Sequence, residues 1–268
     1  MITGDFHTHT VYCDGKNTPR EMVERAIEMG LSALGFSGHG LTTHDSSFCM
    51  TEENTAKYIK EITALKEEFD GKIDILLGLE ADLHSVFDRS LFDYVIGSVH
   101  YYEKDGLKIG VDDCAERTLE AAILFGGTDA LARMYFNDVA RVKTVTGCDI
   151  IGHFDLLSKF DETKPVFLPY SKAYKDSAID AVDELLKTDA VFEVNTGAIS
   201  RGYRTAPYPA PFILKRIREK GGSVILTGDA HSKDTLCYKF DEAMEYVREC
   251  GFDSVKTLTK SGFKDIKI

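Results

Sequence analysis

Short, nearly all-apolar runs alternate with longer segments of helical pattern along the whole chain, and no other feature restricts the fold as much. Parallel strands covered by helices on both faces read as continuous apolar runs, so the alternation predicts a parallel sheet with helices packed against it. The predicted strands lie at 2–10, 31–37, 73–80, 94–100, 150–155, 191–196 and 223–229, with a weaker eighth at 254–258. Seven strong strands of this kind predict an α/β fold, a (β/α) barrel that need not be regular.

Predicted helices fill the spaces between these runs. Thr18 as N-cap and Pro19 as first helical residue begin one helix, which ends at Gly30. A long helical segment at 117–146 should break at Gly126 and Gly127. The other helices are expected at 52–69, 171–187, 211–220 and 240–250. No Pro- or Gly-rich linker divides the chain, so we expect a single domain over residues 1–268.

Charge and composition narrow the classes of partner. A formal net charge of −12 disfavours a broad interface with a phosphate backbone, so we expect no nucleic-acid partner. No apolar run approaches the length of a membrane span, and we expect no membrane association. The first ten residues lack a signal-peptide pattern, and the six cysteines form no CxxC pair. The expected location is therefore the cytoplasm, with reduced thiols.

Pairs of metal-binding residues two positions apart end three of the predicted strands. The pairs are His7/His9, Glu80/Asp82 and Asp229/His231. Residues i and i+2 of a strand point to the same side. The carboxyl ends of parallel barrel strands share one face, which is where active sites lie, so these pairs should converge.

Further histidines occupy equivalent positions. His39, His100 and His153 end three more apolar runs, whereas His44 and His84 lie in loops and are interpreted as non-ligands. A single histidine at a strand end is more often an ordinary core residue than a ligand, but six of the eight histidines share this placement. Two neighbours are ambiguous: Asp82 fits a loop carboxylate, and Asp14 alone fits a turn residue before Gly15. Glu193 and Asn195 also end a strand, and we assign them no role.

The six histidines with Glu80, Asp229 and Asp14 give nine candidate ligands. Catalytic metal sites use about three protein ligands each, so nine ligands suit two or three divalent ions. Imidazole and carboxylate ligands without thiolate favour Zn, Mn or Fe. Clustered ions of this kind polarise a phosphoryl group and lower the pKa of bound water, which predicts a hydrolase with a small phosphorylated substrate.

Seven segments of the chain resemble the PHP (polymerase and histidinol phosphatase) superfamily in order and spacing. They are DFHTHTVYCDG, FSGH, GLEAD, GSVH, IGHFD, EVNTG and TGDAHS. Within that family, GHFDLLSKF and NTGAISRGYRTAPYP are most similar to the monofunctional histidinol-phosphate phosphatases. The resemblance implies a distorted (β/α)7 barrel with a trinuclear metal centre at the carboxyl ends of the strands, and hydrolysis of L-histidinol phosphate in histidine biosynthesis.

Carried over by motif, the resemblance implies three ligand sets. The first is His7, His9, Glu80 and Asp229; the second is Glu80, His100 and His153; the third is Asp14, His39 and His231. Glu80 would bridge two ions. This grouping gives Asp14 a ligand role that its turn position alone does not.

The expected reaction is in-line attack on phosphorus by a metal-bridging hydroxide, with Glu80, Asp229 and His231 as catalytic residues. Arg201 and Lys159 are the expected phosphate-binding cations, and Arg117 and Arg204 are weaker candidates. His231 and Asp155 are both open as proton donors to the leaving group. The rim loop at 41–54 is expected to influence specificity.

Three alternatives stay open. A PHP-type phosphodiesterase or exonuclease would need a basic, aromatic groove, which the charge and the absence of Trp disfavour. A protein-tyrosine phosphatase of similar fold is disfavoured by the segment matches. A non-catalytic metal-binding domain is the least favoured because all nine ligand positions are filled. Barrels often dimerise, so a homodimer is compatible with the sequence.

Overall fold

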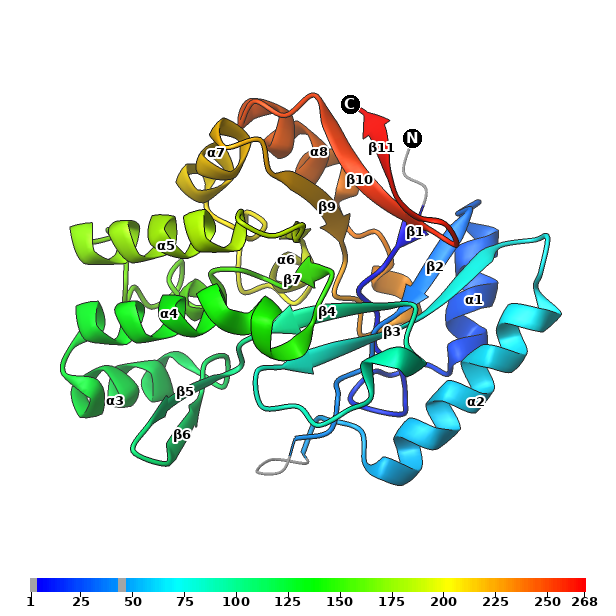
Figure 1. Ribbon diagram of the computed structural model, residues 1–268, viewed down its shortest axis with the longest axis horizontal. Helices are drawn as coiled ribbons and strands as arrows, with labels where there is room; N and C mark the ends of the chain where they lie inside the picture. Colours follow the sequence, from blue (N-terminus) through cyan, green and yellow to red (C-terminus); the bar gives the residue numbers. More distant parts are fainter. Residues whose placement is uncertain (1–3, 43–46) are drawn as a thin grey trace.

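A curled sheet of nine strands forms the centre of the computed structural model, which describes residues 4–42 and 47–268 (Figure 1). The strand order is β1-β2-β3-β4-β7-β8-β9-β10-β11. The seven strands expected from the sequence are β1 (Gly4–Asp5), β2 (Ala33–Phe36), β3 (Asp74–Asp82), β4 (Tyr94–Ser98), β7 (Ile150–Ile151), β8 (Val191–Asn195) and β9 (Ser223–Thr227). Each pairs in parallel with its neighbour.

The sheet closes only at its carboxyl end. There Thr8, beyond β1, forms a parallel bridge with Ala230, beyond β9. Lower on the same strand, Ile225 of β9 pairs instead with Lys256 of β10 (Ser254–Thr259). The strand predicted at 2–10 is therefore regular over only two described residues, and residues 2 and 3 lie outside the described part. The expectation of a distorted (β/α)7 barrel is confirmed, and β10 is the predicted weak eighth strand.

Two strand pairs were not predicted. β11 (Gly262–Lys267) lies antiparallel on β10 at the edge of the sheet, where its largely exposed residues give little apolar signal. β5 (Tyr101–Lys104) and β6 (Leu107–Gly110) form a separate hairpin. Asp105 and Gly106, both with positive φ (52° and 81°), make its two-residue turn. Asp-Gly is a recognised signal for such a turn, and the sequence interpretation overlooked it.

The helices follow the predicted positions closely. They are α1 (Pro19–Glu28), α2 (Glu52–Glu68), α3 (Ala115–Phe125), α4 (Thr128–Thr146), α5 (Lys172–Leu185), α7 (Pro211–Glu219) and α8 (Phe240–Glu249), with a short unpredicted α6 (Gly197–Ser200). Thr18 and Glu21 form a capping box at the start of α1. Gly126 and Gly127 break α3 from α4 because both adopt positive φ, 98° and 105°.

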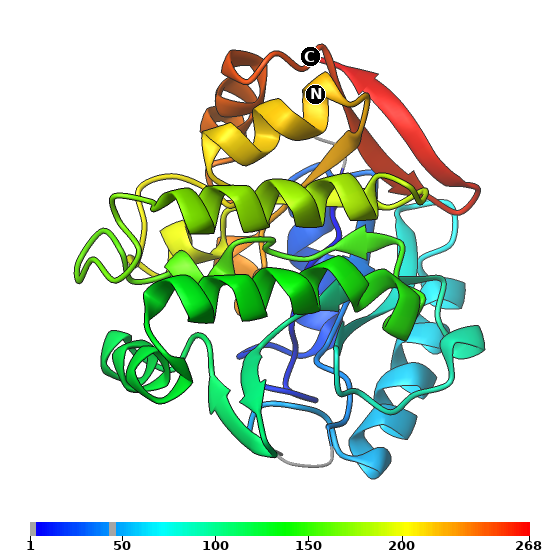
Figure 2. The same cartoon turned by 60° about the vertical axis from the view of Figure 1, so that its left-hand side comes forward.

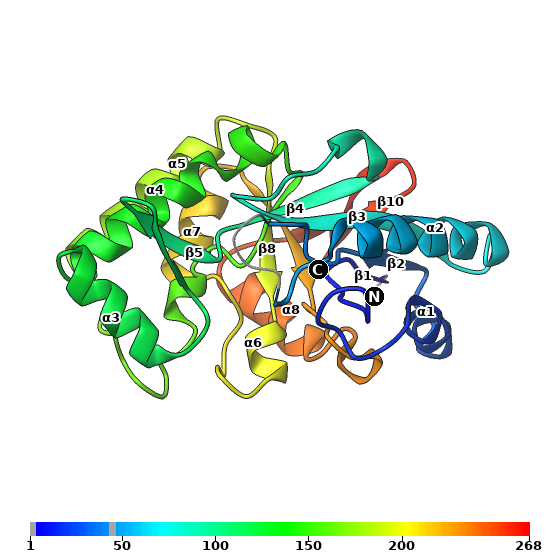
Figure 3. The ribbon, with the colours of Figure 1, turned by 90° about the horizontal axis from the view of Figure 1, so that it is seen from below.

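The helices cover the outside of the curled sheet. Figure 2 shows α4 and α5 side by side across one flank, and Figure 3 shows α2 and α3 at opposite ends of the molecule, with the β5–β6 hairpin on the α3 side. Among the described residues, no helix is long and apolar enough to cross a membrane. The six cysteines all lie in the described part of the chain, and no disulfide joins any two of them.

The interior of the barrel has an apolar lower layer. Its members are Phe6, Ala33, Leu76, Tyr94, Ile96, Ile150, Val191, Ile225 and Leu258, each 5% exposed or less. The only hydroxyl among them, on Tyr94, donates to the carbonyl oxygens of Phe6 (2.6 Å) and Phe36 (3.1 Å). Farther along the same strands the interior positions become polar, and they form the base of the candidate site.

Candidate metal centre

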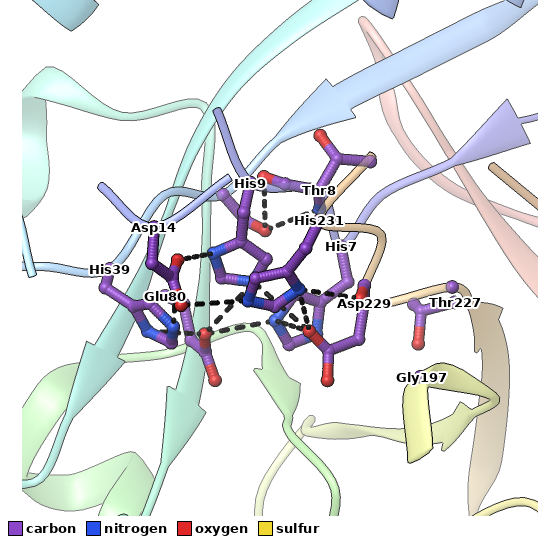
Figure 4. Close-up of polar contacts among 12 residues, drawn as sticks. His7, Thr8, His9, Asp14, His39, Glu80, Gly197, Thr227, Asp229 and His231 are labelled. Carbon is purple, nitrogen blue, oxygen red and sulfur yellow. Dashed lines mark hydrogen bonds and ion pairs between the residues drawn. The ribbon is translucent and has the colours of Figure 1, made fainter. Parts of the chain in front are cut away.

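Glu80 lies near His7, His9 and His39 in Figure 4, and histidines from four different segments contact its carboxylate. Its Oε2 lies 3.1 Å from Nε2 of His7 and 2.9 Å from Nδ1 of His39. Its Oε1 lies 2.9 Å from Nε2 of His153 and 3.3 Å from Nε2 of His100. A carboxylate with two such sets of neighbours, one on each oxygen, has the placement expected of a bridging ligand.

Asp229 forms the second carboxylate of the site, in a left-handed backbone conformation with φ of 46°. Its Oδ1 lies 3.3 Å from Nε2 of His9 and 3.4 Å from Nδ1 of His231. Its Oδ2 accepts a hydrogen bond of 2.8 Å from Arg201, which also donates to the Asp229 carbonyl oxygen. Arg201 therefore fixes one oxygen of Asp229 while the other oxygen points at the histidines.

Asp14 closes the outer side of the site and is 31% exposed. Its carboxylate lies 3.1 Å from Nε2 of His231, 3.6 Å from Nδ1 of His9 and 3.8 Å from Nε2 of His39. The residue that the sequence alone explains as part of a turn thus faces three imidazoles.

All nine predicted ligands meet at this one place, and three groups of ligand atoms are close enough to hold an ion. The groups are His9, Asp14, His39 and His231; His7, His9 and Asp229; and His39, Glu80 and His100. The first two overlap the expected sets. The third contains His39 in place of His153, because each ring nitrogen of His39 faces a different carboxylate.

The residues fit divalent metal ions. His7 Nε2, His9 Nε2 and Glu80 Oε2 are buried close to one another or to neighbouring site residues, yet none of the three makes a hydrogen bond of acceptable geometry within the protein. Buried polar atoms are almost always paired, so such a set calls for a bound species that satisfies all of them. Cys13 Sγ lies 3.7 Å from His9 Nδ1, and burial raises the pKa of its thiol to about 11; Cys13 belongs to none of the three ligand groups. Nitrogen and oxygen donors of this kind suit a first-row divalent ion.

The electrostatics of the site favour charged carboxylates. Burial would raise the pKa of Glu80, but His39, His7 and His100 lower it well below its usual range. Burial also opposes charge on His7, where Glu193 and Glu80 outweigh it and raise the pKa. The pKa of His9 falls to about 3, through burial and the neighbouring His231 and His39 rings.

Glu193 of β8 is a central residue to which the sequence interpretation gave no role. Its Oε1 lies 2.5 Å from Nδ1 of His7 and accepts a 2.6 Å hydrogen bond from Thr227. Its Oε2 accepts from the His153 backbone N–H (2.5 Å) and from Asn195 (3.0 Å). A carboxylate inside an otherwise apolar strand was the available signal. Ligating imidazoles are commonly oriented by such partners.

Asp82 supports a second histidine in the same way. Its Oδ2 accepts a 2.8 Å hydrogen bond from the His100 backbone N–H and lies 3.3 Å from Nδ1 of the same ring. Its predicted place outside the ligand set agrees with this geometry. His84, interpreted as a non-ligand, instead pairs with Glu103 at 3.0 Å.

A cleft of about 730 Å³ opens onto the site. Seven predicted ligands line it, whereas His7 and His9 do not. Lys159 and Arg201, the predicted phosphate-binding residues, also line it, as does Arg117. Lys159 is 8% exposed and pairs with Asp112 at 3.0 Å. The weaker candidate Arg204 is buried and is not among the lining residues.

The β5–β6 hairpin and the rim loop supply the outer walls of the cleft. The hairpin and the residues after it contribute Lys108, Ile109, Asp112 and Asp113. From the rim loop at 41–54, Ser47 and Phe48 reach the cleft, while residues 43–46, including His44, lie outside the described part. The Phe48 ring packs edge-on against His39, with centroids 4.9 Å apart.

Comparison with known proteins agrees with this geometry. The "probable histidinol-phosphatase" of Deinococcus radiodurans is 33% identical over 260 residues, covering 92% of this chain and 93% of that protein. The histidinol-phosphatase of Bacillus subtilis is 23% identical, covering 91% of this chain and 99% of that protein. A crystal structure of histidinol phosphate phosphatase from Lactococcus lactis, complexed with zinc, L-histidinol and phosphate, has the same fold, with a TM-score of 0.73, 22% identity and 98% of each chain covered.

The family model for the PHP domain matches residues 5–197, which include seven of the nine predicted ligands. The remaining two, Asp229 and His231, follow β9, and each shares a ligand group with residues inside the matched range. By this match, this chain belongs to the PHP domain family.

Proposed function

We propose that this protein is a metal-dependent phosphate monoester hydrolase that converts L-histidinol phosphate and water into L-histidinol and phosphate. The observation that carries the proposal is the convergence of nine nitrogen and oxygen ligands around Glu80, at a cleft that also holds Lys159 and Arg201. The names of the Deinococcus and Bacillus relatives, which align over nearly the whole chain, support the substrate.

The proposed centre holds two or three divalent ions, of Zn, Mn or Fe. We assign His7, His9 and Asp229 to one ion and Asp14, His39 and His231 to another, with Glu80 shared between ions. His100 and His153 complete the set through Oε1 of Glu80. When bound, such ions neutralise phosphoryl oxygens and lower the pKa of a bound water towards neutrality, which is the chemistry that the bridging-hydroxide hypothesis requires.

The remaining work falls to the side chains around the phosphoryl group. Arg201 lines the cleft and is held by Asp229, so we assign it to the phosphoryl group as a fixed cation. Lys159 would supply a second positive charge once it exchanges Asp112 for a phosphate oxygen. In the reaction a water oxygen bonds to phosphorus, the P–O bond to the alcohol breaks, and the leaving alkoxide takes a proton.

Asp155 does not fit the role of proton donor. It is fully buried, it does not line the cleft, and its Oδ2 accepts a hydrogen bond from the Ala210 backbone N–H. His231 does line the cleft, with 22% of its side chain exposed. Because His231 is also assigned to an ion, and a metal-bound imidazole is a poor proton donor, the leaving-group proton is assigned to water in the cleft.

We propose a single domain over residues 1–268, because β9, β10 and β11 extend the same sheet that β1 to β4, β7 and β8 begin. The expected cytoplasmic location and the homodimer stay predictions.

The test is turnover of L-histidinol phosphate, a dinucleotide and phosphotyrosine, measured in parallel on the metal-loaded protein. Release of inorganic phosphate reports on the two monoesters, and release of a mononucleotide reports on the dinucleotide. We expect L-histidinol phosphate to be turned over far faster than the other two. Preferential cleavage of the dinucleotide would assign the chain to the exonuclease alternative, and absence of any turnover would favour a non-catalytic domain.

A further inference from the structure

Two loop segments carry the predicted phosphate-binding cations. Residues 153–161, which follow β7, contain Lys159, and residues 196–209, which follow β8, contain Arg201. Both cations line the cleft. If both cations bind one phosphate, the distance between Lys159 and Arg201 must match its size. The two segments that carry them therefore have to be held at a constant distance from each other.

Arg204 belongs to the Arg201 segment, and its side chain contacts both that segment and the Lys159 segment. Its NH1 donates to the Ser158 hydroxyl (2.6 Å) and lies 3.4 Å from the Ser158 carbonyl oxygen. Its Nε donates to the Ala206 carbonyl oxygen (3.2 Å), and its guanidinium lies 4.3 Å from the centre of the Tyr208 ring. Ser158 directly precedes Lys159 in the chain, so this contact acts on the backbone that presents the lysine.

The two chain neighbours of Arg204, Tyr203 and Thr205, also contact the Lys159 segment or the residue that follows it. The Thr205 backbone N–H donates to Glu162 (2.8 Å). The Lys159 ammonium lies 4.9 Å above the Tyr203 ring, which belongs to the Arg201 segment. Lys159 thus lies between the Arg201 segment on one side and Asp112 on the other.

We propose that Arg204 is a positioning residue for phosphoryl recognition: it holds the Lys159 segment against the Arg201 segment and so sets the affinity for the phosphate group. This inference rests on the proposed phosphatase function. Arg204 is 9% exposed and does not line the cleft, so it acts through Ser158 and not by touching substrate. Without it, Lys159 keeps its Asp112 partner but loses the fixed backbone that places it near the phosphate.

The geometry also explains why arginine is needed. Three contacts in different directions, to Ser158, to Ala206 and to the face of Tyr208, use the planar guanidinium fork. A lysine keeps the charge but has a single point of attachment and cannot reproduce the fork. Arg204→Lys therefore separates the positioning effect from the effect of positive charge alone.

The experiment compares Arg204→Gln, Arg204→Lys and Ser158→Ala with the unaltered protein. Four quantities are measured: kcat, KM, the inhibition constant of inorganic phosphate and that of the dephosphorylated product L-histidinol. We expect both Arg204 variants to raise KM and the phosphate inhibition constant about tenfold, as loss of charge-assisted hydrogen bonds does. Ser158→Ala should raise both about threefold. The constant for L-histidinol should not move in any of them.

A matched control exists at the opposite end of the barrel. Arg89 donates to the Phe92 carbonyl oxygen (2.7 Å) and to Asp149 (2.6 Å), and so joins the segments before β4 and β7. Arg89→Gln should lower thermal stability and leave the phosphate inhibition constant unchanged. This variant measures how loss of an arginine that joins two segments changes stability and phosphate binding when neither segment carries a cation of the cleft.

The proposal is overturned if the Arg204 variants lose only stability and keep the phosphate constant of the unaltered protein, or if Arg204→Lys restores that constant fully. Should Arg204→Gln fail to fold, Ser158→Ala decides alone. Failure of the proposed function would appear differently, as absence of turnover of L-histidinol phosphate and of a generic monoester. Calorimetric binding of inorganic phosphate to the metal-loaded protein then still measures the effect of Arg204.

Discussion

The interior of this barrel has two layers built from the same strands, and the lower layer is apolar whereas the upper layer is polar. In the lower layer Val191, Ile96 and Ile225 pack against one another and leave no polar atom to satisfy. Two residues farther along, the strands place Glu193, Ser98 and Thr227 in the upper layer, where a network of hydrogen bonds supports the metal centre. Within one strand, stability and chemistry are therefore separated by a single step of the pleat.

The difference teaches where each kind of mutation should act. A well-packed apolar layer responds to substitution mainly through the free energy of unfolding. A layer with buried, unpartnered ligand atoms responds through metal binding and turnover, because those atoms are satisfied by the ions and not by the protein.

Removal of the central ligand should have the largest effect. Glu80→Gln keeps the shape of the side chain but removes the charge that faces His7, His39, His100 and His153. We expect phosphate release to fall by at least about a thousandfold, which corresponds to about 4 kcal/mol of transition-state stabilisation. Metal content per chain, measured by elemental analysis, should fall in the same samples. Full activity with normal metal content would show that Glu80 is not a ligand.

A cavity in the lower layer should lower the stability of the protein and leave its turnover nearly unchanged. Ile225→Ala removes a fully buried side chain and should lower the free energy of unfolding by about 2–5 kcal/mol, with the milder Ile225→Val costing about 0.5–1.5 kcal/mol. Chemical denaturation measures both. The turnover per folded molecule should stay within about twofold, since Ile225 belongs to the apolar layer and is none of the nine candidate ligands. A large loss of turnover at unchanged stability would break the separation of the layers.

The next prediction compares two residues of β8, Glu193 in the upper layer and Val191 in the lower layer. Glu193→Gln leaves the volume of β8 unchanged but replaces one oxygen that pairs with His7 or the His153 backbone by a donor. Metal affinity should fall about 10–100-fold, as it does when the partner of a ligating imidazole is changed. Competition with a chromogenic chelator measures it. Val191→Ala, two residues earlier in the lower layer, is the control and should reduce stability without changing metal affinity.

The sequence predicted the elements well, and the nine candidate ligands that it singled out lie together in the structure, because both are local signals. An apolar run with a histidine or acid at its end is visible in a few residues, as at His7, His39 and Asp229. Glu193 was given no role because its partner His7 lies 186 positions away, and a lone acid in a strand can face either side. Arg204 was given as a weaker candidate for phosphate binding. Its burial and its hydrogen bond to Ser158 depend on the folded arrangement and cannot be predicted from nearby residues in the sequence. The sequence also gives no sign that the two ring nitrogens of His39 face different carboxylates, those of Asp14 and Glu80.

The smallest expected effect is the pH dependence of metal binding. Although burial opposes their charge, neighbouring carboxylates raise the pKa of His7, His100 and His231 in the metal-free protein. These imidazoles carry protons that must leave before they can coordinate, so metal binding releases protons and its affinity rises from pH 7 to pH 8. Titration calorimetry in two buffers of different ionisation enthalpy measures the release. Identical apparent enthalpies in both buffers would contradict it.

Metal-dependent release of phosphate from L-histidinol phosphate, assayed in the same experiment for the unaltered protein and for Glu80→Gln, tests the central claim most directly. The upper layer is predicted to hold two or three divalent ions and to hydrolyse the substrate, with activity lost on chelation, restored by Zn, Mn or Fe, and absent in Glu80→Gln under every metal condition. Undiminished phosphate release by the chelated protein, or by Glu80→Gln, would contradict the account.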